Sequence, residues 1–346
     1  MKTPHRSHPL VNLPWDFITS QTTASSFLQF VSRKYHKELW FGLPITLSSH
    51  RTETDYSKVQ FELRLQDNGD SVLYLVALTG EFTYTPYWSI ETEGLGSHLV
   101  FSESGYIYLI ETNKTSIRLT PGDAVSIQDF YHRAILDFDG VIRQYVYPRT
   151  HKSNASWAQE WSLVWDEPPN ACLAVRTTLG SGTCRFNSYC ILDEEQRTSC
   201  RCPDGYSYLD PSNTFGGCKQ DFVLQSCELG GSVEAPQFEL KEMRNIDWPL
   251  NGYEEYFPIN EDQCRQECLV DCFCAVAIFN YDRRWKKKMP VSNGKMDYSV
   301  SRKTLIKGPR ANFSLPNCSS YKLLQRERLD GSDSHWISAI WRIWDS

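Results

Sequence analysis

Residues 61–76 read FELRLQDNGDSVLYLV, and this stretch indicates the fold most clearly. Apolar residues at positions 61, 63 and 65 alternate with charged residues at 62 and 64, which is the pattern of a strand with one buried face. Asn68-Gly69 favours a tight hairpin turn, and an apolar run resumes from Val72 to Val76. The stretch therefore predicts a β-hairpin.

The hairpin pattern recurs twice along the chain. LVFSESGYIYL at residues 99–109 turns at Gly105, and LDFDGVIRQY at residues 136–145 turns at Gly140. Successive turn glycines, beginning with that of the first hairpin, are 36 and 35 residues apart. This period favours a repeated β unit over hairpins that arise by chance, and such units pack together because each alone buries only one face.

Composition excludes several classes of protein. The chain has 346 residues, 40% of them hydrophobic, which is enough for several domains with real cores. The net charge of −6 argues against a partner that is a nucleic acid or an anionic membrane surface. No apolar run approaches the roughly 18–20 residues of a membrane helix, and the N-terminal residues lack the apolar core of a signal peptide.

The cysteines are confined to the second half of the chain. None of the 12 precedes Cys172, eleven lie between Cys172 and Cys274, and the last is Cys318. Clustering of this kind predicts a disulfide framework formed in the secretory pathway. Four sequons support this compartment and are candidate N-glycosylation sites: Asn113, Asn154, Asn312 and Asn317.

Two local patterns stand out in the second half. Trp157, Trp161 and Trp165 are spaced as on one face of a helix, and we expect them to pack one domain onto the next rather than to stack on a ligand. Farther on, Asn260-Glu-Asp-Gln263 resembles a capping box that opens a helix, and a strand follows at residues 275–279.

Nothing in the sequence predicts catalysis. The chain has no P-loop, no kinase glycine-rich loop and no nucleophile elbow, and we expect no metal and no cofactor. Asp137 and Asp139 could form a glycosidase pair, but a turn role is the stronger interpretation. Lys286-Lys-Lys288 predicts a solvated strand edge rather than a polyanion site, and zinc is the minor alternative for the closely spaced cysteines after residue 263.

Six short motifs carry a resemblance to a known family. They are LQDNGDSVLY (65–74), FDGVIRQY (138–145), CRFNSYC (184–190), CRCPDGY (200–206), CRQECLVDCFC (264–274) and WKKK (285–288). With them the chain resembles the extracellular region of a plant G-type (bulb-type) lectin S-receptor-like serine/threonine kinase, truncated at both ends. The resemblance implies a mostly β fold: truncated bulb-lectin-like β-prism repeats, then a small disulfide-rich EGF-like module and an α+β PAN/apple-like module.

The resemblance also implies a division of the chain. The expected segments are an unassigned N-terminal segment (1–42), bulb-type lectin-like or S-locus glycoprotein-like β repeats (43–148), a Trp-rich connector (149–171), an EGF-like module (172–218), a PAN/apple-like module (219–308) and a tail without a transmembrane helix (309–346). The first part of the lectin domain is expected to be missing or replaced.

The family's mannose motif, Q-x-D-x-N-x-V-x-Y, maps onto the first hairpin. Gln66, Val72 and Tyr74 match it, whereas Asn68 and Asp70 exchange the expected carboxylate and amide. These groups could surround sugar hydroxyls with acceptors and donors, so the five residues are the candidate carbohydrate-binding site. The alternative is that they serve only the turn.

The resemblance implies cysteine pairs in the EGF-like module, namely Cys172–Cys190, Cys184–Cys200 and Cys202–Cys218. Leu192 stands where a calcium-binding version has Asp or Asn, so calcium is not expected. The PAN-like module holds Cys227, Cys264, Cys268, Cys272 and Cys274, whose pairing stays open. Arg284 replaces a family cysteine, so we expect Cys264 to lose its partner, unless Cys318 substitutes.

The implied function is recognition without catalysis. The chain is expected to be an extracellular or cell-surface region that binds a carbohydrate of mannose type, or a protein or peptide ligand, for signalling by a kinase domain that is absent here. A homodimer through the PAN-like module is a further expectation. The alternatives are a soluble secreted decoy or co-receptor, a nonfunctional truncated product and, less favoured, a secreted enzyme that acts on glycans.

Overall fold

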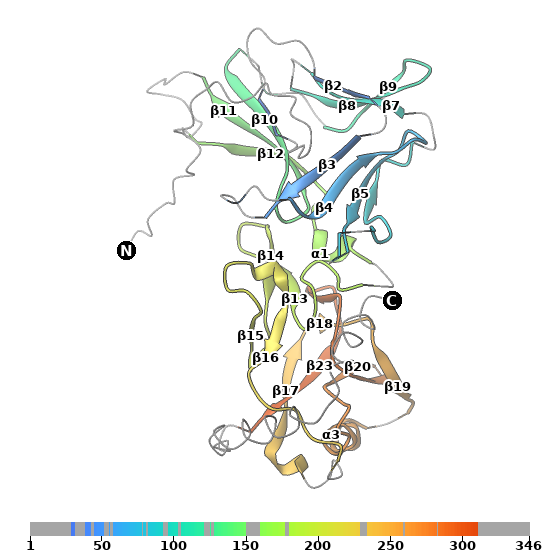
Figure 1. Cartoon of the computed structure of the whole chain (residues 1–346), viewed down its shortest axis with the longest axis vertical. Coiled ribbons are helices and arrows are strands. Elements are labelled where there is room, and N and C mark those ends of the chain that lie inside the picture. The colour runs from blue at the N-terminus through green and yellow to red at the C-terminus, as the bar shows by residue number, and fades with distance from the viewer. Residues whose placement is uncertain are drawn as a thin grey trace, which may run out of the picture.

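The computed structural model describes residues 29–31, 39–42 and 45–310, apart from the short gaps 52–54, 56–57, 78, 81, 93–95, 103–104, 121–124, 126–127, 150–159, 177–179, 229–233, 259 and 282. The molecule is elongated (Figure 1), with a β domain at one end and the cysteine-rich second half extending from it to α3 at the other end. The fold is mostly β, as predicted.

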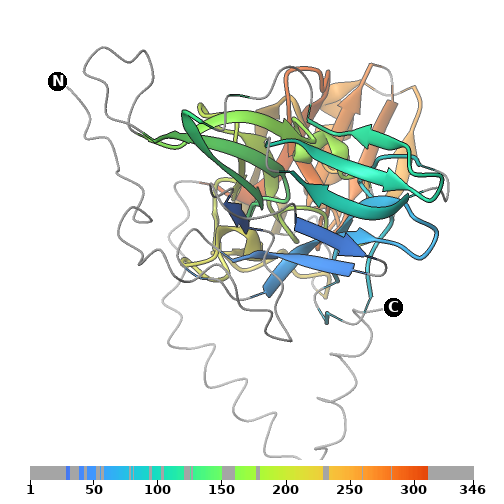
Figure 2. The same cartoon turned by 90° about the horizontal axis from the view of Figure 1, so that it is seen from above.

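The β domain is a prism of three antiparallel four-stranded sheets, seen end-on in Figure 2. Each sheet is built around one of the three predicted hairpins, so the predicted repeat is confirmed. The three sheet orders are β3 (Ile45–His50), β4 (Lys58–Leu65), β5 (Ser71–Leu75), β6 (Trp88–Ser89); β2 (Leu39–Gly42), β7 (Gly96–Phe101), β8 (Ile107–Glu111), β9 (Ser116–Arg118); and β1 (Gln29–Val31), β10 (Phe130–Leu136), β11 (Ile142–Pro148), β12 (Ser162–Glu167).

The core of the prism is formed by the inward faces of all three sheets. Phe61, Leu73, Leu109 and Leu136 are fully buried in one cluster, which draws on each hairpin. The apolar residues of 61–65 face this core, as the alternation predicts, but the opposite face is not open to solvent, since Glu62 is buried and Arg64 is half-buried.

The prism includes strands outside the range expected for it. We expected its first part to be missing, but β1 pairs with β10 and β2 pairs with β7, so each sheet has four strands. Strands of three and four residues are too short to show a periodic pattern, so the sequence of residues 29–31 and 39–42 does not predict them.

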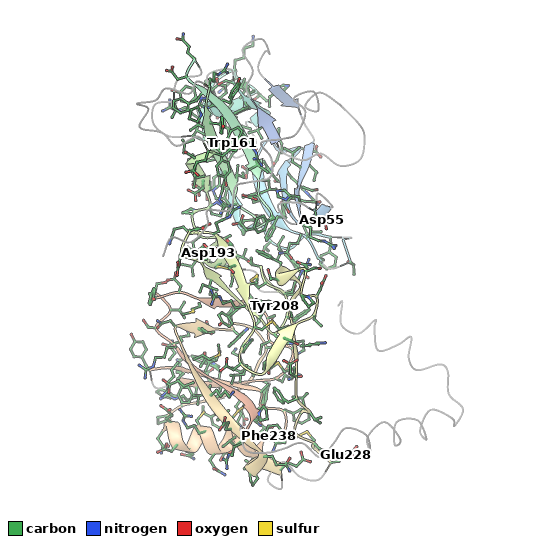
Figure 3. The ribbon with its side chains drawn as sticks, turned by 90° about the vertical axis from the view of Figure 1, so that its left-hand side faces the viewer. Asp55, Trp161, Asp193, Tyr208, Glu228 and Phe238 are labelled. Carbon is green, nitrogen blue, oxygen red and sulfur yellow. A yellow bond between two sulfur atoms is a disulfide. The ribbon has the colours of Figure 1, made fainter. Side chains whose placement is uncertain are left out.

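The tryptophan connector also contributes a strand rather than a helix. β12 pairs with β11, and Trp165 packs against the prism core. Trp161, labelled in Figure 3, lies with its ring centroid 5.5 Å from that of Tyr147. The expectation that these side chains join two domains is therefore wrong for Trp161 and Trp165, because both pack within the prism, and Trp157 lies outside the described residues.

The EGF-like module is a small set of short elements held by disulfides. It comprises α1 (Ala171–Ala174), β13 (Tyr189–Leu192), β14 (Thr198–Arg201), β15 (Tyr206–Tyr208), η2 (Thr214–Gly216) and β16 (Cys218–Gln220). Its core consists of two buried cystines together with Phe215. Such a unit is too small to be stable without staples.

The PAN-like module packs one helix on a five-stranded sheet. Its elements are η3 (Ala235–Gln237), β17 (Phe238–Arg244), β18 (Ile246–Asp247), β19 (Gly252–Tyr256), α3 (Glu261–Val270), β20 (Val276–Asn280), β21 (Arg283–Lys287), β22 (Gly294–Met296) and β23 (Lys303–Pro309), with sheet order β17-β23-β20-β21-β19. Asn260 caps α3 by accepting a hydrogen bond from the Gln263 backbone N–H at 2.8 Å, as the capping-box pattern predicts.

The two small modules share structure. β13 of the EGF-like module pairs with β22, which in turn pairs with β18. Trp248 is fully buried and its indole N–H donates to the carbonyl of Ser188 at 2.8 Å.

No helix in the described part of the chain is long and apolar enough to cross a bilayer.

Candidate carbohydrate-binding site

The tip of the first hairpin is a tight turn between β4 and β5. The Gln66 N–H donates to the carbonyl of Asp70 at 2.9 Å, and the Gly69 N–H donates to the carbonyl of Gln66 at 2.8 Å. Gly69 has φ 81° and touches the backbone of Gly96 so closely that a β-carbon would collide with it. The turn thus requires glycine here and brings the hairpin against the next sheet.

Gln66 and Tyr74 form a polar pair beside this turn. The Gln66 side-chain amide donates to the Tyr74 hydroxyl, and both residues are half-buried. The guanidinium of Arg64 lies 5.2 Å from the centre of the Tyr74 ring and is fixed by Glu62 at 2.7 Å. The site therefore presents an amide, a phenol and a cation on one surface.

Asp70 supports the turn from within. Its carboxylate accepts hydrogen bonds from Ser89 Oγ at 2.6 Å and Thr92 Oγ1 at 3.3 Å, and its N–H donates to Asn68 Oδ1 at 3.1 Å. Asn68 is exposed, whereas Val72 is buried in the prism. The five motif residues therefore divide into a polar group at the surface, a carboxylate that positions the turn, and one core residue.

The third hairpin has different residues at the same positions. Aligned on Gly140, it carries Asp137, Asp139, Arg143 and Tyr145 where the first hairpin has Gln66, Asn68, Val72 and Tyr74. Arg143 donates to both carboxylate oxygens of Asp139, at 2.6 and 2.7 Å, and to Asp137 at 3.2 Å. All three side chains are buried.

This buried cluster joins the prism to the EGF-like module. Arg197 donates to Asp137, and the Thr198 N–H donates to Asp139 Oδ2 at 3.2 Å. Burial alone would raise the pKa of the Asp137 carboxyl, but Arg197 and Arg143 outweigh it and hold that pKa below its usual range.

The glycosidase alternative for the aspartate pair does not fit this arrangement, because both carboxylates are tied to arginines. Nor do the two aspartates serve only the turn, since both also accept hydrogen bonds from arginines. Sequence reasoning missed Arg143 and Arg197, although an arginine in the apolar alternation of residues 141–146 was a usable signal.

The prediction of a solvated strand edge is wrong for Lys286 and Lys287, whereas Lys288 is exposed. Lys286 and Lys287 are 3% and 4% exposed. Lys286 Nζ lies 3.1 Å from carboxylate oxygens of both Asp271 and Glu254, and Lys287 Nζ donates to the carbonyl of Leu250 at 3.0 Å. Burial lowers the pKa of Lys287 to about 8. The two lysines are successive residues of β21 and point to opposite faces of the sheet, and each is buried against its own partners.

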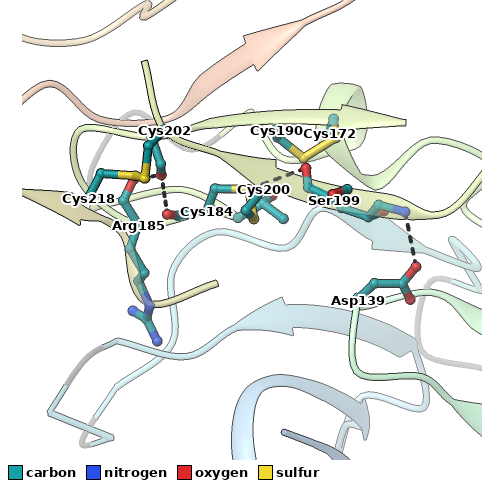
Figure 4. Close-up of a disulfide and its surroundings, with 12 residues drawn as sticks. Asp139, Cys172, Cys184, Arg185, Cys190, Ser199, Cys200, Cys202 and Cys218 are labelled. Atoms are coloured by element: carbon teal, nitrogen blue, oxygen red, sulfur yellow. Dashed lines mark hydrogen bonds between the residues drawn. A yellow bond between two sulfur atoms is a disulfide. The ribbon is translucent and has the colours of Figure 1, made fainter. Parts of the chain in front are cut away.

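The cysteines of the EGF-like module form Cys172–Cys190, Cys184–Cys200 and Cys202–Cys218, the three pairs that the family resemblance implies. Figure 4 shows these bridges side by side.

The PAN-like module has two bridges and one unpaired thiol. The bridges are Cys227–Cys272 and Cys268–Cys274, while Cys264 is buried and free. Zinc binding by these cysteines is therefore ruled out, since four of the five sulfurs are in disulfides. Cys318 lies outside the described residues, and the described residues contain no other cluster of metal-ligand type.

Of the four candidate glycosylation sites, the structure describes one. Asn113 is exposed in the turn between β8 and β9, where its Oδ1 accepts a hydrogen bond from the Thr115 N–H at 2.8 Å. Asn154, Asn312 and Asn317 lie outside the described residues.

A three-sheet prism followed by EGF-like and PAN-like modules defines a lectin-type receptor region. No family model matches the chain. It is, however, 44% identical over 281 residues to the rice G-type lectin S-receptor-like serine/threonine-protein kinase LECRK2, which is 80% of this chain and 35% of the kinase. The rice relative LECRK4 is 45% identical over 275 residues (78% and 34%), and RLK1 of Arabidopsis thaliana is 32% identical over 276 residues (75% and 32%).

The chain is therefore homologous to the G-type lectin S-receptor-like serine/threonine-protein kinases, and the resemblance drawn from its motifs is confirmed. It spans about a third of the length of these relatives, and the matched part is their lectin ectodomain and not their kinase domain. The chain thus corresponds to a non-catalytic region.

A comparison with solved structures finds bulb lectins. The mannose-specific lectin of bluebell (Scilla campanulata) is 15% identical, covers 38% of this chain and 98% of its own, and has a TM-score of 0.24. The snowdrop (Galanthus nivalis) agglutinin is 18% identical, covers 36% and 99%, and has a TM-score of 0.20.

Proposed function

We propose that this chain is the extracellular recognition region of a lectin receptor-like kinase and that it binds a carbohydrate of mannose type at the tip of the first hairpin. The homology to lectin receptor kinases supports the receptor role. The disulfides and the exposed sequon at Asn113 fit an extracellular location.

The observation that carries the sugar site is the arrangement around Tyr74. Its hydroxyl is joined to the Gln66 amide, and Arg64 lies over its ring, so the polar groups are held in place before a ligand arrives. Asn68 extends the same tip into solvent, and Asp70 holds the turn rather than the sugar. Pre-positioned donors and acceptors beside an aromatic ring suit the hydroxyl groups of a hexose.

Isothermal titration of the chain with methyl α-D-mannoside tests this site. Gln66→Ala and Tyr74→Ala should each weaken binding at least tenfold, because each removes a polar contact and frees its partner. Tyr298→Ala is the matched control, since Tyr298 is 90% exposed and lies in the PAN-like module. Undiminished binding by both hairpin variants would remove the site from this hairpin.

A second proposal concerns a protein partner: the PAN-like module forms a homodimer. β19 is an edge strand of the five-stranded sheet, and residues 252–255 on it are exposed. Phe257 and Phe273 are 64% and 63% exposed, and Tyr253 bonds to Asp271, two residues before Phe273. An open edge flanked by exposed aromatic rings favours pairing with a second copy.

Sedimentation of the chain over a range of concentrations tests the dimer. The double variant Phe257→Ser, Phe273→Ser should stay monomeric where the parent chain dimerises. Leu209→Ser, in the EGF-like module and 57% exposed in the parent, should leave the dimer intact. A parent chain that remains monomeric at high concentration would contradict this proposal.

A further inference from the structure

Arg185 is a buried arginine for which no carboxylate partner is found among the described residues. Its residue is 8% exposed, and its Nη1 lies 3.5 Å from both the Val76 carbonyl and Ser181 Oγ, at the outer limit of a hydrogen bond. Neither partner carries a charge. Figure 4 shows its guanidinium extending from the disulfide-bonded module toward the prism.

The contrast with Arg143 is informative. Arg143 is equally buried, but two aspartates neutralise it at 2.6 to 3.2 Å. A buried cation with no counter-charge is unfavourable unless something else supplies the charge. Burial also lowers the pKa of Arg185 to about 10, so the side chain is still charged at neutral pH.

A cavity of about 420 Å³ lies at Arg185, between the prism and the EGF-like module. Its lining includes two arginines, Arg185 and Arg51, and among the described residues that line it there is no aspartate or glutamate. Thr79 and Gly80 at its margin are exposed, so solvent reaches it. Its volume falls in the range of small-molecule sites, about 300–1,000 Å³.

The remaining walls are suited to a sugar ring. Phe138 and Phe215 form an apolar surface, with ring centroids 6.0 Å apart in an edge-to-face arrangement. Gln60 and Asn213 contribute side-chain amides, and Gln60 Nε2 is fixed by the carbonyl of Thr183 at 2.8 Å. An aromatic wall takes the C–H face of a pyranose, and amides take its hydroxyl groups.

We propose that this cavity binds an acidic saccharide, with the carboxylate of a uronic acid residue paired to Arg185. A guanidinium fork matches a carboxylate in two parallel hydrogen bonds, and this pair would supply the missing counter-charge. Arg51 also lines the cavity, but its charge is shared with Asp55, whose carboxylate lies 3.8 Å from the Arg51 Nε at the surface, so the pairing rests on Arg185. The cavity shares no residue with the hairpin site, so this inference does not depend on the proposed mannose binding.

The test uses the full chain with its disulfides formed. Isothermal titration compares methyl α-D-galacturonoside, the uncharged methyl ester of the same sugar, and sodium phosphate, all at one ionic strength. We expect the acid to bind at least tenfold more tightly than the ester, because a charge-assisted pair is lost in the ester. Inorganic phosphate should neither bind as tightly nor displace the sugar.

Variants assign the binding to the cavity. Arg185→Gln should weaken binding of the acid at least tenfold, while Arg201→Gln, an exposed arginine of the same module, should not change it. Tyr74→Ala should leave acid binding intact, which separates this cavity from the hairpin site. Without ligand, Arg185→Gln should melt at the same temperature as the parent or higher, since it removes an uncompensated buried charge.

Three results would overturn the inference. One is equal affinity for the acid and the ester, which needs no variant and so does not depend on folding of a mutant. Another is unchanged acid binding by Arg185→Gln. The third is phosphate that binds as tightly as the sugar acid, which would indicate a simple anion site.

Discussion

Replacing Arg143 with methionine tests how the prism is joined to the EGF-like module. In the parent chain Asp137 and Asp139 share two arginines, Arg143 and Arg197, so the buried cluster is neutral. Arg143→Met leaves two buried carboxylates with one cation. Breaking a buried ion pair from one side costs about 3–5 kcal/mol.

That loss should lower the midpoint of thermal unfolding by about 6–20 °C, at roughly 2–4 °C per kcal/mol for a unit of this size. Calorimetry and guanidinium unfolding at pH 7 measure it. Arg118→Met is the control, because Arg118 is exposed on β9, and it should change the free energy of unfolding by about 0.5 kcal/mol or less.

The loss should also depend on pH in a defined direction. With one cation gone, a proton on one aspartate relieves the repulsion, so the folded-state pKa of that aspartate rises above its unfolded value of about 3.9. The variant then binds more protons folded than unfolded, and its deficit grows as the pH rises from the unfolded pKa to the raised folded value, by up to about 1.4 kcal/mol per pH unit. In the parent chain burial raises the pKa of Asp139, whereas Arg197 and Arg143 outweigh burial and lower that of Asp137. Asp137 alone of the two therefore contributes stability that is present above its unfolded pKa and is lost as the pH falls through the folded value.

A double variant tests whether the charge imbalance causes the loss of stability. Arg143→Met with Asp139→Asn restores a balanced pair, Asp137 with Arg197, and keeps an oxygen for the Thr198 N–H. It should recover most of the lost stability. A single variant that loses less than about 1 kcal/mol, or a double variant no more stable than the single one, would refute the reasoning.

Three further predictions concern the second half of the chain. Replacing Cys184 and Cys200 with serine opens a bridge between residues 16 apart and should cost about 3 kcal/mol in guanidinium unfolding; an unchanged midpoint would contradict this. Cys264 is buried, and burial raises the pKa of its thiol. Iodoacetamide at pH 8 should therefore label it only after denaturation, which peptide mass spectrometry would show. Rapid labelling of the native chain would count against this burial. Lys287→Met should raise the free energy of unfolding by about 2 kcal/mol at pH 7, after the lost hydrogen bond to the Leu250 carbonyl is deducted. This gain should shrink from pH 8 upward, because the parent's amine then deprotonates. A variant that is less stable than the parent at pH 7 would refute this prediction.

Local sequence patterns predicted correctly the elements that depend only on neighbouring residues. The capping pattern at Asn260 predicts the start of α3, and the alternation from Phe61 to Leu65 predicts β4. Turn glycines at a spacing near 35 residues predict the repeat, because each turn needs a residue with positive φ. These features depend on neighbouring residues alone.

Partners distant in the sequence were the source of the errors. Trp161 and Trp165 are spaced as on a helix, but the segment pairs with β11, so that Trp165 lies in strand β12 and Trp161 directly before it. Lys286 and Lys287 look solvated in sequence, but Lys286 is buried with Asp271 and Glu254, and Lys287 is buried against the carbonyl of Leu250. A pattern in the sequence cannot show which distant segment will lie beside it, and that segment decides burial.

The sequence by itself determined the mostly β class, the three hairpins, the disulfide-rich second half and the kinship with lectin receptor kinases, because these follow from periodicity, turn chemistry and motif spacing. Only the tertiary structure showed that equivalent hairpins have diverged. The tip of the first is open to solvent, whereas that of the third is closed by Arg143 and docks the EGF-like module. Only the tertiary structure places Arg185 at a cavity whose described lining contains no carboxylate, because that lining is drawn from segments far apart in the sequence.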